Sequence, residues 1–301
     1  MQNSLIAPEY LKPGDSIGLI STARKISESE IQFAVQTIES WGLKVILGPN
    51  LFKSENQFSG SDNERAADLQ FMISHPEVKA ILCSRGGYGT VRILDKVDFK
   101  PFLARPKWVA GYSDITALHA KINHELGIQS LHATMPINFQ SNTSESIESL
   151  RKALFGELKS YDFESGSELK FSAEGILGGG NLSMIYSLSG SEDFWKTEGG
   201  LLFLEDLDEY LYHIDRMMMN LKRSGLLSRM KGILLGGMTD MNDNAIPYGK
   251  SAIEIIEEHA AEIGVAVITG FPAGHIDDNR TMYFGRWHNL RVDGTQATLQ
   301  F

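Results

Sequence analysis

One serine lies where it could act as a nucleophile. Ser113 stands in the stretch Gly111-Tyr-Ser-Asp-Ile115, between a short apolar strand, 108–110, and a helical pattern that begins at Asp114. A tight turn from strand to helix exposes the hydroxyl at the carboxyl edge of the sheet and directs the first N–H groups of the helix toward the atom under attack. The stretch departs from Gly-x-Ser-x-Gly at its last position, so two interpretations stay open: a nucleophile, or an ordinary helix N-cap.

A glycine-rich turn follows another predicted strand. Arg85-Gly-Gly-Tyr-Gly89 comes after the apolar segment 79–83, and in an open α/β sheet the carboxyl ends of the strands face one crevice. The backbone N–H of Gly86 or Gly87, together with that of Asp114, could therefore form an oxyanion hole. A turn with positive φ and a phosphate cradle are the alternatives, although the pattern matches neither the P-loop nor Gly-x-Gly-x-x-Gly.

A serine nucleophile needs a base, and His275 stands apart among the eight histidines of the chain. It ends the loop Gly270-Phe-Pro-Ala-Gly-His275, whose glycines let a side chain project from the backbone. The alternatives are a loop histidine without a partner, and a metal site with Asp277 and Asp278 that has no established ligand spacing. The histidines in helical patterns, which are more often surface or core groups, are His119, His124 and His213.

Glu205 is the candidate for the acid that orients the imidazole. It ends the apolar strand Leu201-Leu-Phe-Leu204, where a carboxylate would be poorly solvated unless it were paired. A carboxylate in that position can hold the imidazole and stabilise its cation. Asp206 and Asp208 are nearby competitors for the same role.

Two further features have a chemical and a structural interpretation. Gly178-Gly-Gly-Asn181 opens a helical pattern and could hold a substrate carboxylate through backbone N–H donors, or be a flexible turn. Cys83 could be a nucleophile, but a lone cysteine at the end of an apolar strand is usually a small buried hydrophobic residue.

The composition restricts the class of function. The chain has 301 residues, of which 42% are hydrophobic, and a formal net charge of -10 that would repel nucleic acid. Its single cysteine excludes an internal disulfide and a thiolate-rich zinc site. The first ten residues lack the pattern of a secretory signal, and no apolar stretch reaches the ~20 residues needed to cross a bilayer. We therefore expect a cytoplasmic protein with no membrane partner, acting on a small molecule or peptide.

The order of elements predicts two α/β domains. In the first half, short apolar runs alternate with helical patterns, which indicates βαβ units and a mainly parallel sheet. The segment 156–172 is polar and poor in periodicity, and is predicted to be a linker. We therefore place a nucleophile-bearing domain at 1–155 and a second domain, with the candidate glutamate and histidine, at 173–301.

Six segments together resemble the LD-carboxypeptidase family, also called the muramoyltetrapeptide carboxypeptidase family. They occur in the family's order along nearly the whole chain, so the combination is specific although each segment alone is not. The segments are Leu11-Lys-Pro-Gly-Asp15, Ser84-Arg-Gly-Gly-Tyr-Gly89, Gly111-Tyr-Ser-Asp-Ile-Thr116, Gly178-Gly-Gly-Asn-Leu182, Leu204-Glu-Asp-Leu-Asp-Glu209 with Ile214-Asp-Arg-Met217, and Gly270 to His275.

The resemblance implies a fold and a reaction. The implied fold has an N-terminal flavodoxin-like or class I amidotransferase-like domain with a parallel sheet, a C-terminal swivelling β/α domain, and commonly a homodimer. The implied reaction releases terminal D-alanine from an L,D-linked murein tetrapeptide during cell-wall recycling, and needs no metal or cofactor.

The resemblance also assigns roles to residues. Ser113, Glu205 and His275 match the family's catalytic triad, and the oxyanion would be held by the N–H of Asp114 with that of Gly86 or Gly87. The candidates for binding the charged ends of the substrate are Arg85 and Asn181.

Two rival functions remain open at this point. The same fold is implied for microcin C self-immunity peptidases, which cleave aminoacyl-nucleotide amides and need an aromatic platform for adenine, for which Trp195, Trp287 and Tyr186 are candidates. The other rival is a non-catalytic small-molecule-binding protein in which Ser113 merely caps its helix.

Overall fold

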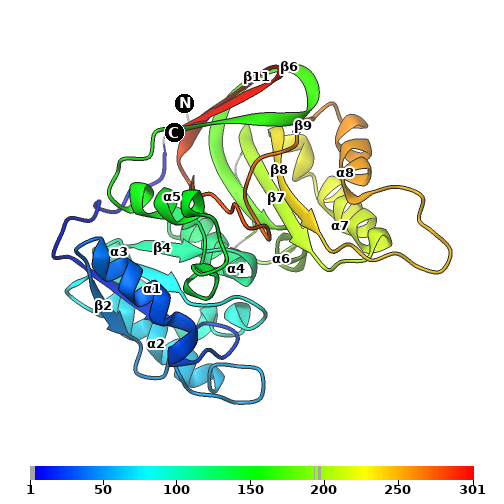
Figure 1. Cartoon of the computed structure of the whole chain (residues 1–301). Coiled ribbons are helices and arrows are strands. Elements are labelled where there is room, and N and C mark those ends of the chain that lie inside the picture. The colour runs from blue at the N-terminus through cyan, green and yellow to red at the C-terminus, as the bar shows by residue number, and fades with distance from the viewer. Residues whose placement is uncertain (1–3, 193, 196–197) are drawn as a thin grey trace. The chain divides into compact units, whose positions relative to one another are not determined.

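The computed structural model describes residues 4–192, 194–195 and 198–301, which form two compact units. The N-terminal unit consists of Leu5–Leu158 and Asp277–Tyr283, and the C-terminal unit contains Ser4, Lys159–Ile276 and Phe284–Phe301. The chain therefore passes between the units more than once, as the colours of Figure 1 allow the reader to follow. In the part of the chain described, no helix is both long enough and apolar enough to span a membrane.

The N-terminal unit is built on a six-stranded sheet with the strand order β2-β1-β3-β4-β5-β10. The pairs between β2, β1, β3, β4 and β5 are all parallel, and the order 2-1-3-4-5 is that of flavodoxin-like sheets. The central strands are buried on both faces, as expected for a parallel sheet covered by helices. The strands are β1 (Ser16–Ile20), β2 (Lys44–Leu47), β3 (Val78–Cys83), β4 (Trp108–Gly111), β5 (Ser130–His132) and β10 (Met282–Phe284).

The helices of this unit follow the periodic segments of the sequence. In the first helix Ile31, Ala34 and Ile38 recur on one face and are buried. The second begins with a capping box, in which the Ser61 backbone N–H donates to Glu64 Oε2 at 2.9 Å. The helices are α1 (Glu28–Ser40), α2 (Asp62–Ser74), α3 (Lys100–Ala104), α4 (Thr116–Ala120) and α5 (Ser144–Leu154), with 3₁₀ turns at Thr90–Arg92, Leu94–Lys96, Ser113–Ile115 and Pro136–Asn138 and a π-helical turn at Lys121–Glu125.

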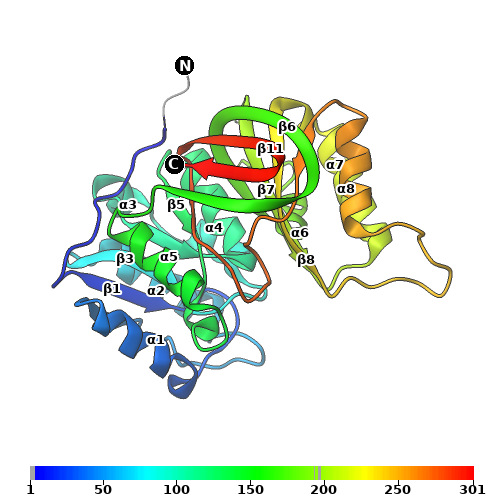
Figure 2. The same ribbon diagram turned by 45° about the horizontal axis from the view of Figure 1, so that its top comes forward.

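The C-terminal unit has a five-stranded sheet with the order β11-β6-β7-β8-β9. Strands β6 to β9 are parallel, and β11 is antiparallel to β6. Figure 2 shows the long curved β6 beside β11. The elements are β6 (Ser160–Asn181), α6 (Leu182–Ser187), β7 (Gly200–Leu207), α7 (Leu211–Arg223), a 3₁₀ turn at Leu227–Arg229, β8 (Met230–Thr239), α8 (Ala252–Ala261), β9 (Ala266–Ile268) and β11 (Trp287–Gln300).

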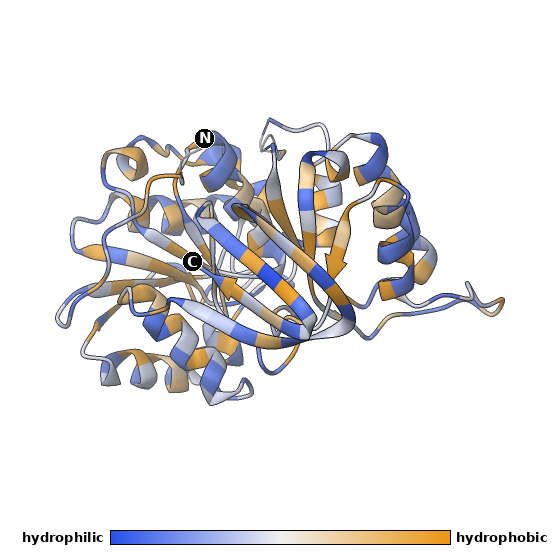
Figure 3. Cartoon of the chain, turned by 90° about the horizontal axis from the view of Figure 1, so that it is seen from above, coloured by the Kyte–Doolittle hydropathy of each residue, from blue (hydrophilic) through white to orange (hydrophobic). Residues whose placement is uncertain are grey.

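The polar segment 156–172, predicted to be a linker, is mostly a strand. From Ser160 onward it belongs to β6, whose first half pairs antiparallel with β11. Most side chains in this half are partly or fully exposed, so polar residues occupy most positions and hide the period of two that marks a strand. The mixed colours along both strands in Figure 3 reflect this composition. The units divide at Leu158, and 277–283 returns to the N-terminal unit, which the expected two-domain division omits.

An aromatic cluster ties the ends of the N-terminal unit to its central strand. Trp108 of β4 is fully buried, and its ring centroid lies 5.9 Å from that of Tyr10 and 5.6 Å from that of Tyr283. The Trp108 indole N–H donates to the carbonyl of Glu9 at 3.0 Å. The Tyr283 hydroxyl donates to the carbonyl of Ala153 at 2.9 Å. The returning segment is therefore part of the core of this unit.

We predict that Trp108→Ala lowers the free energy of unfolding by about 3–5 kcal/mol, because truncation leaves a large cavity among buried rings. Urea unfolding followed by circular dichroism measures the change. Phe33→Ala on α1 is the control, since that side chain is 45% exposed and should cost much less. Equal losses in the two variants would contradict the assignment of Trp108 to the core.

Candidate active site

The backbone at Ser113 is strained, which distinguishes it from a helix cap. Strand β4 ends at Gly111, Tyr112 is extended, and Ser113 has a φ of 63° in the left-handed region that non-glycine residues seldom adopt. An N-cap residue instead has extended φ and ψ, so the capping interpretation of Ser113 is wrong. Ser113 is partly exposed, between a buried Tyr112 and a buried Asp114. The turn is the strained strand-to-helix geometry typical of a nucleophile elbow.

The first residue of this turn must be a glycine for steric reasons. A Cβ on Gly111 would lie 2.8 Å from Cγ1 of Ile115, which is closer than real Cβ contacts allow. The imidazole Nε2 of buried His119 lies 2.9 Å from the Gly111 carbonyl oxygen. Burial lowers the pKa of His119 to about 4, so this ring is neutral and supports the turn rather than carrying charge.

The glycine-rich loop lies against Ser113, as the strand order requires. β3 and β4 are parallel neighbours, with Leu82 opposite Ala110, so the loops that follow them leave the same edge of the sheet. A Cβ placed on Gly86 would lie 3.2 Å from Ser113 Cβ and 3.3 Å from its Oγ. Gly86 is therefore close enough to contribute a backbone donor beside the hydroxyl.

Glu205 and His275 form a buried hydrogen-bonded pair in the C-terminal unit. His275 Nδ1 lies 2.6 Å from Glu205 Oε2, and the Glu205 side chain is fully buried. Glu205 lies within β7, and His275 lies in the loop after β9. The distance is that of a charge-assisted hydrogen bond. Because this bond uses Nδ1, the other ring nitrogen, Nε2, can interact with a different group.

Opposing effects set the basicity of His275. Burial lowers the pKa of the imidazole, but the Glu205 charge, the Glu205 hydrogen bond and the Asp206 charge together raise it above its ordinary value. The ring is thus a stronger base than a free histidine. Because the folded-state pKa is raised, protonated His275 adds stability at low pH, and this contribution is lost as the pH rises through the folded-state pKa.

A glycine lets the histidine loop approach the carboxylate. Gly274 has a φ of 104°, and a Cβ there would lie 2.7 Å from Glu205 Cβ. On the next strand, a Cβ on Gly236 would lie 2.4 Å from the carbonyl oxygen of Ala273. The Gly237 N–H donates to that same carbonyl at 2.9 Å. Two glycines of β8 and one of the loop thus allow the close approach that His275 needs.

Asp206, a competitor for the role of the acid, has a different function. Consecutive strand residues point to opposite faces, and its carboxylate accepts the Asn181 side-chain amide at 2.8 Å and the Ser183 backbone N–H at 2.9 Å. Burial, followed by the charge of Glu205, raises the pKa of Asp206 to about 7, and these hydrogen bonds oppose the shift. Asp206 therefore joins β7 to the start of α6 while Glu205 meets the imidazole.

The two residues predicted to bind substrate have partners within their own units. The Arg85 guanidinium lies 3.5 Å from Glu30 Oε1 and 3.4 Å from the Lys25 carbonyl, both near the start of α1. Asn181 is the N-cap of α6, because its Oδ1 accepts the Met184 N–H at 3.1 Å. For Asn181 in particular, the side chain serves the local structure.

The alternative sites proposed from the sequence have structural explanations. Cys83 is fully buried, and burial raises the pKa of its thiol to about 12, so it behaves as a small hydrophobic residue. Asp278 accepts the Arg280 guanidinium at 2.9 Å. Over the residues that the structure describes, no group of three or more His, Cys, Asp or Glu side chains could hold a metal ion.

The structure thus gathers the candidate residues into two groups. Ser113, Asp114, Gly86 and Gly87 belong to the N-terminal unit, and Glu205 and His275 to the C-terminal unit. Sequence reasoning missed the separate role of Asp206 and the need for a glycine at position 274. The signal available for Asp206 was the Glu-Asp pair at the end of an apolar strand. The signal available for Gly274 was its place directly before His275.

Comparisons with known proteins agree on one group of enzymes. The family described as LD-carboxypeptidase N-terminal domain matches residues 17–133, and the LD-carboxypeptidase C-terminal domain matches residues 174–290. A probable murein peptide carboxypeptidase of Bacillus subtilis is 36% identical over 280 residues, which cover 89% of this chain and 86% of that protein.

Solved structures with the same fold include two kinds of protein. A muramoyltetrapeptide carboxypeptidase from Oxalobacter formigenes has a TM-score of 0.86 at 26% identity, covering 94% of this chain and 97% of that chain. MccF in complex with glutamyl sulfamoyl guanosine also has a TM-score of 0.86, at 23% identity, covering 99% of this chain and 98% of that chain. The second likeness concerns the fold alone.

We predict that Glu205→Gln lowers the pKa of His275, because burial is then no longer opposed by the neighbouring charge. Titration of the imidazole by NMR should give a pKa above about 6.5 in the parent and a lower one in the variant. Glu209→Gln is the control, since it removes the carboxylate that lies 2.6 Å from His213 instead. An unchanged His275 pKa in Glu205→Gln would exclude Glu205 as the source of the shift.

We predict that Gly274→Ala displaces His275 from Glu205, because the added methyl group overlaps the Glu205 side chain. Gly264→Ala is the matched control, since Gly264 also has a positive φ, 71°, but no atom within 4 Å of an added Cβ. The control should lose about 1–2 kcal/mol of stability from backbone strain, with an unchanged His275 titration. Gly274→Ala should lose more stability and lower the His275 pKa. Identical behaviour of the two variants would show that steric overlap with Glu205 is unimportant.

Proposed function

The chain belongs to the LD-carboxypeptidase family, and we propose that it is a serine carboxypeptidase that releases terminal D-alanine from a murein tetrapeptide. The observation that carries the proposal is the contact of 2.6 Å between His275 Nδ1 and the buried Glu205 carboxylate. A histidine with a raised pKa, oriented by a carboxylate, is the base that a serine nucleophile requires. The strained turn at Ser113 supports the assignment of that serine as the nucleophile.

In the proposed mechanism, Nε2 of neutral His275 accepts the proton of the Ser113 hydroxyl. The Ser113 oxygen bonds to the carbonyl carbon that precedes D-alanine, and the carbonyl oxygen takes the negative charge. His275 then donates its proton to the amide nitrogen, the C–N bond breaks, and D-alanine leaves. Water transfers a proton to His275, attacks the acyl-enzyme and releases the shortened peptide, and Ser113 regains its proton.

Glu205 stabilises the imidazolium that forms during both proton transfers. Its carboxylate is held in a buried strand, so the full effect of its charge reaches the ring without competition from water. It fixes Nδ1 as the protonated nitrogen, which leaves Nε2 to accept the proton. In its ionised form, Asp206 places a second negative charge near the same ring.

The oxyanion is held by two backbone donors on different loops. We assign one to the N–H of Asp114, the residue that follows the nucleophile, and one to Gly86 or Gly87. Gly86 is favoured because an added Cβ there would lie 3.3 Å from Ser113 Oγ. Loss of one such donor reduces turnover by roughly 100- to 1000-fold in related chemistry.

The family resemblance also supports proposals on assembly and location. We propose a homodimer that acts in the cytoplasm on murein peptides. The reaction as written uses side chains and backbone groups of this chain with water, and we propose no cofactor.

The rival substrate is an aminoacyl-nucleotide, by analogy with MccF in complex with glutamyl sulfamoyl guanosine. Of the three aromatic candidates for a base platform, Trp195 is only 2% exposed. Tyr186 packs edge-on against His213, with ring centroids 5.8 Å apart, and Lys231 Nζ lies 5.8 Å from the Trp287 ring centroid. None of these three observations favours a nucleobase over a peptide.

We predict that the purified protein releases D-alanine from murein tetrapeptide and that Ser113→Ala reduces the rate by at least about 10⁴-fold, because a triad fails without its nucleophile. Mass spectrometry of free D-alanine in buffer with chelator measures the reaction. Ser144→Ala on α5 is the control, since this exposed serine lies outside the proposed machinery. Equal rates for parent and Ser113→Ala would refute the mechanism. Inactivity of both on tetrapeptide, with hydrolysis of an aminoacyl sulfamoyl adenosine by the parent, would favour the rival substrate.

A further inference from the structure

We propose that the Asp114 side chain is a positioning residue: its carboxylate holds the glycine loop, Arg85–Gly89, against the nucleophile turn and thereby aligns the two oxyanion donors. This inference rests on the proposed function, because the oxyanion hole belongs to that mechanism. It assigns to the Asp114 carboxylate a role separate from that of its backbone N–H.

The carboxylate is buried and directed at the end of the glycine loop. Asp114 is 1% exposed, and its Oδ2 accepts the backbone N–H of Thr90 at 2.9 Å. Thr90 is the first residue after Arg85-Gly-Gly-Tyr-Gly89 and begins a 3₁₀ turn. One side chain therefore links the residue that follows Ser113 to the residue that follows the loop.

The loop needs such an external restraint because its own backbone is permissive. Gly87 has a φ of 112° and Gly89 a φ of 146°, conformations that glycine adopts at little cost and can also leave easily. Arg24 makes two contacts with the loop. Its backbone N–H donates to the Gly86 carbonyl at a long distance of 3.4 Å, and its side chain packs against Gly87. The 2.9 Å bond to a carboxylate is the stronger restraint.

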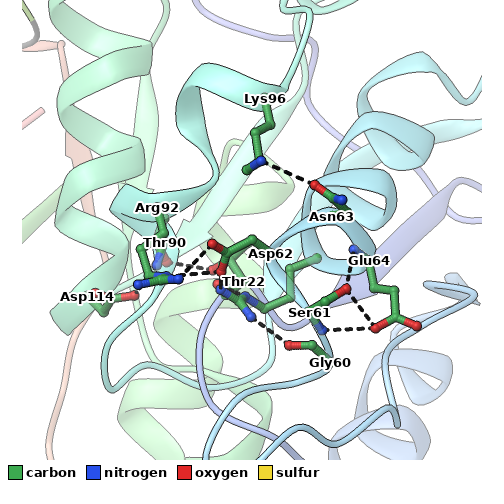
Figure 4. Close-up of polar contacts among 11 residues, drawn as sticks. Thr22, Gly60, Ser61, Asp62, Asn63, Glu64, Thr90, Arg92, Lys96 and Asp114 are labelled. Atoms are coloured by element: carbon green, nitrogen blue, oxygen red, sulfur yellow. Dashed lines mark hydrogen bonds and ion pairs between the residues drawn. The ribbon is translucent and has the colours of Figure 1, made fainter.

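The restraint continues into the core of the unit. The Thr90 hydroxyl lies 2.7 Å from the Thr22 hydroxyl, just beyond the end of β1. The Thr22 carbonyl in turn accepts from Arg65 Nε at 3.0 Å. Figure 4 shows Asp114, Thr90 and Thr22 with the polar residues that surround them.

A buried arginine provides the fixed point of this network. Arg65 is 1% exposed, donates to the Gly60 carbonyl at 2.7 Å and pairs with Asp62 at 2.5 Å. Asp62 also pairs with Arg92 at 2.8 Å, as Figure 4 shows. With three of its donor groups satisfied, the guanidinium has little freedom to move.

Burial and hydrogen bonding act on the Asp114 carboxyl in opposite directions, and the net effect is a raised pKa. Burial raises the pKa of its carboxyl, while the hydrogen bonds from Thr90 and Gly89 and the charge of Arg65 oppose that shift. In the ionised form the carboxylate binds the loop N–H groups more tightly than a neutral acceptor would. The geometry therefore makes the Asp114 side chain a buried hydrogen-bond acceptor for the backbone N–H of Thr90.

A misaligned oxyanion hole weakens only the step in which the oxyanion forms. Substrate binding should change little, because the donors act mainly on the developing charge. A purely structural residue would instead lower stability without a specific effect on reaction at Ser113. The reactivity of Ser113 toward a fluorophosphonate separates these cases, since the phosphoryl oxygen of that probe also occupies the oxyanion hole.

The experiment compares the second-order rate constant for labelling of Ser113 by a fluorophosphonate in the parent, Asp114→Ala and Asp114→Asn. We expect labelling of Asp114→Ala to be about 100-fold slower, as for a lost oxyanion donor. Asp114→Asn keeps an acceptor oxygen and should fall by less than about tenfold. With tetrapeptide as substrate, kcat should fall in the same order while KM stays near the parent value.

Thr143→Ala is the matched control for stability. Thr143 is the N-cap of α5 in the same unit, where its Oγ1 accepts the Ser146 N–H at 3.2 Å. This variant should lower Tm without slowing the labelling of Ser113. If circular dichroism shows Asp114→Ala to be unfolded, Asp114→Asn carries the test, with a reduced labelling rate expected.

The outcomes separate the inference from the proposed function. Labelling of a folded Asp114 variant at the parent rate would overturn the positioning role while leaving the serine mechanism intact. A parent protein that is not labelled at Ser113 would instead overturn the proposed function. Slower labelling of Asp114→Ala with partial rescue in Asp114→Asn would support the positioning role.

Discussion

A left-handed backbone at Ser113 costs on the order of 1–3 kcal/mol, and the surrounding turn must supply the contacts that hold it. Gly111 allows Ile115 to pack closely, and Nε2 of His119 lies 2.9 Å from the Gly111 carbonyl oxygen. Asp114 fastens the adjoining loop. Because these contacts are buried, the strain at the serine is sustained by the core of the N-terminal unit rather than by a ligand.

Two consecutive carboxylates in β7 show how one strand can serve two purposes. Glu205 meets a single imidazole, whereas Asp206 accepts side-chain and backbone N–H groups at the start of α6. Successive side chains of a strand point to opposite faces, which separates the two carboxylates. The pairing of β7 with β8 also changes register between Leu204 and Asp206. The fold of α6 and the orientation of the imidazole are therefore linked through one peptide unit.

The two α/β domains follow from local periodicity, and so they could be predicted from the sequence and are confirmed. The approach of Gly86 to Ser113 also follows from the rule that parallel strands end at one edge. The contacts of Arg85 with Glu30 and of Asn181 with Asp206 did not follow, because these partners are distant in sequence. Binding of substrate by Arg85 and Asn181 stays a prediction. The pairing of β6 with β11 was not predicted, because the exposed positions of these strands carry polar residues. The hydrogen bond between the Thr90 N–H and the Asp114 carboxylate was not predicted either, because no sequence pattern marks it.

The return of the chain to the N-terminal unit has a consequence for biosynthesis. Strand β10 pairs with β5 in the first sheet, yet about 150 residues separate His132 from Met282. At roughly 5–20 residues per second, the edge of β5 stays unpaired for about 8–30 s while the second unit is synthesised. During that interval the open edge of β5 can pair with other nascent chains, but its length of three residues limits such pairing. The shortness of β5 thus protects the unfinished sheet until β10 arrives.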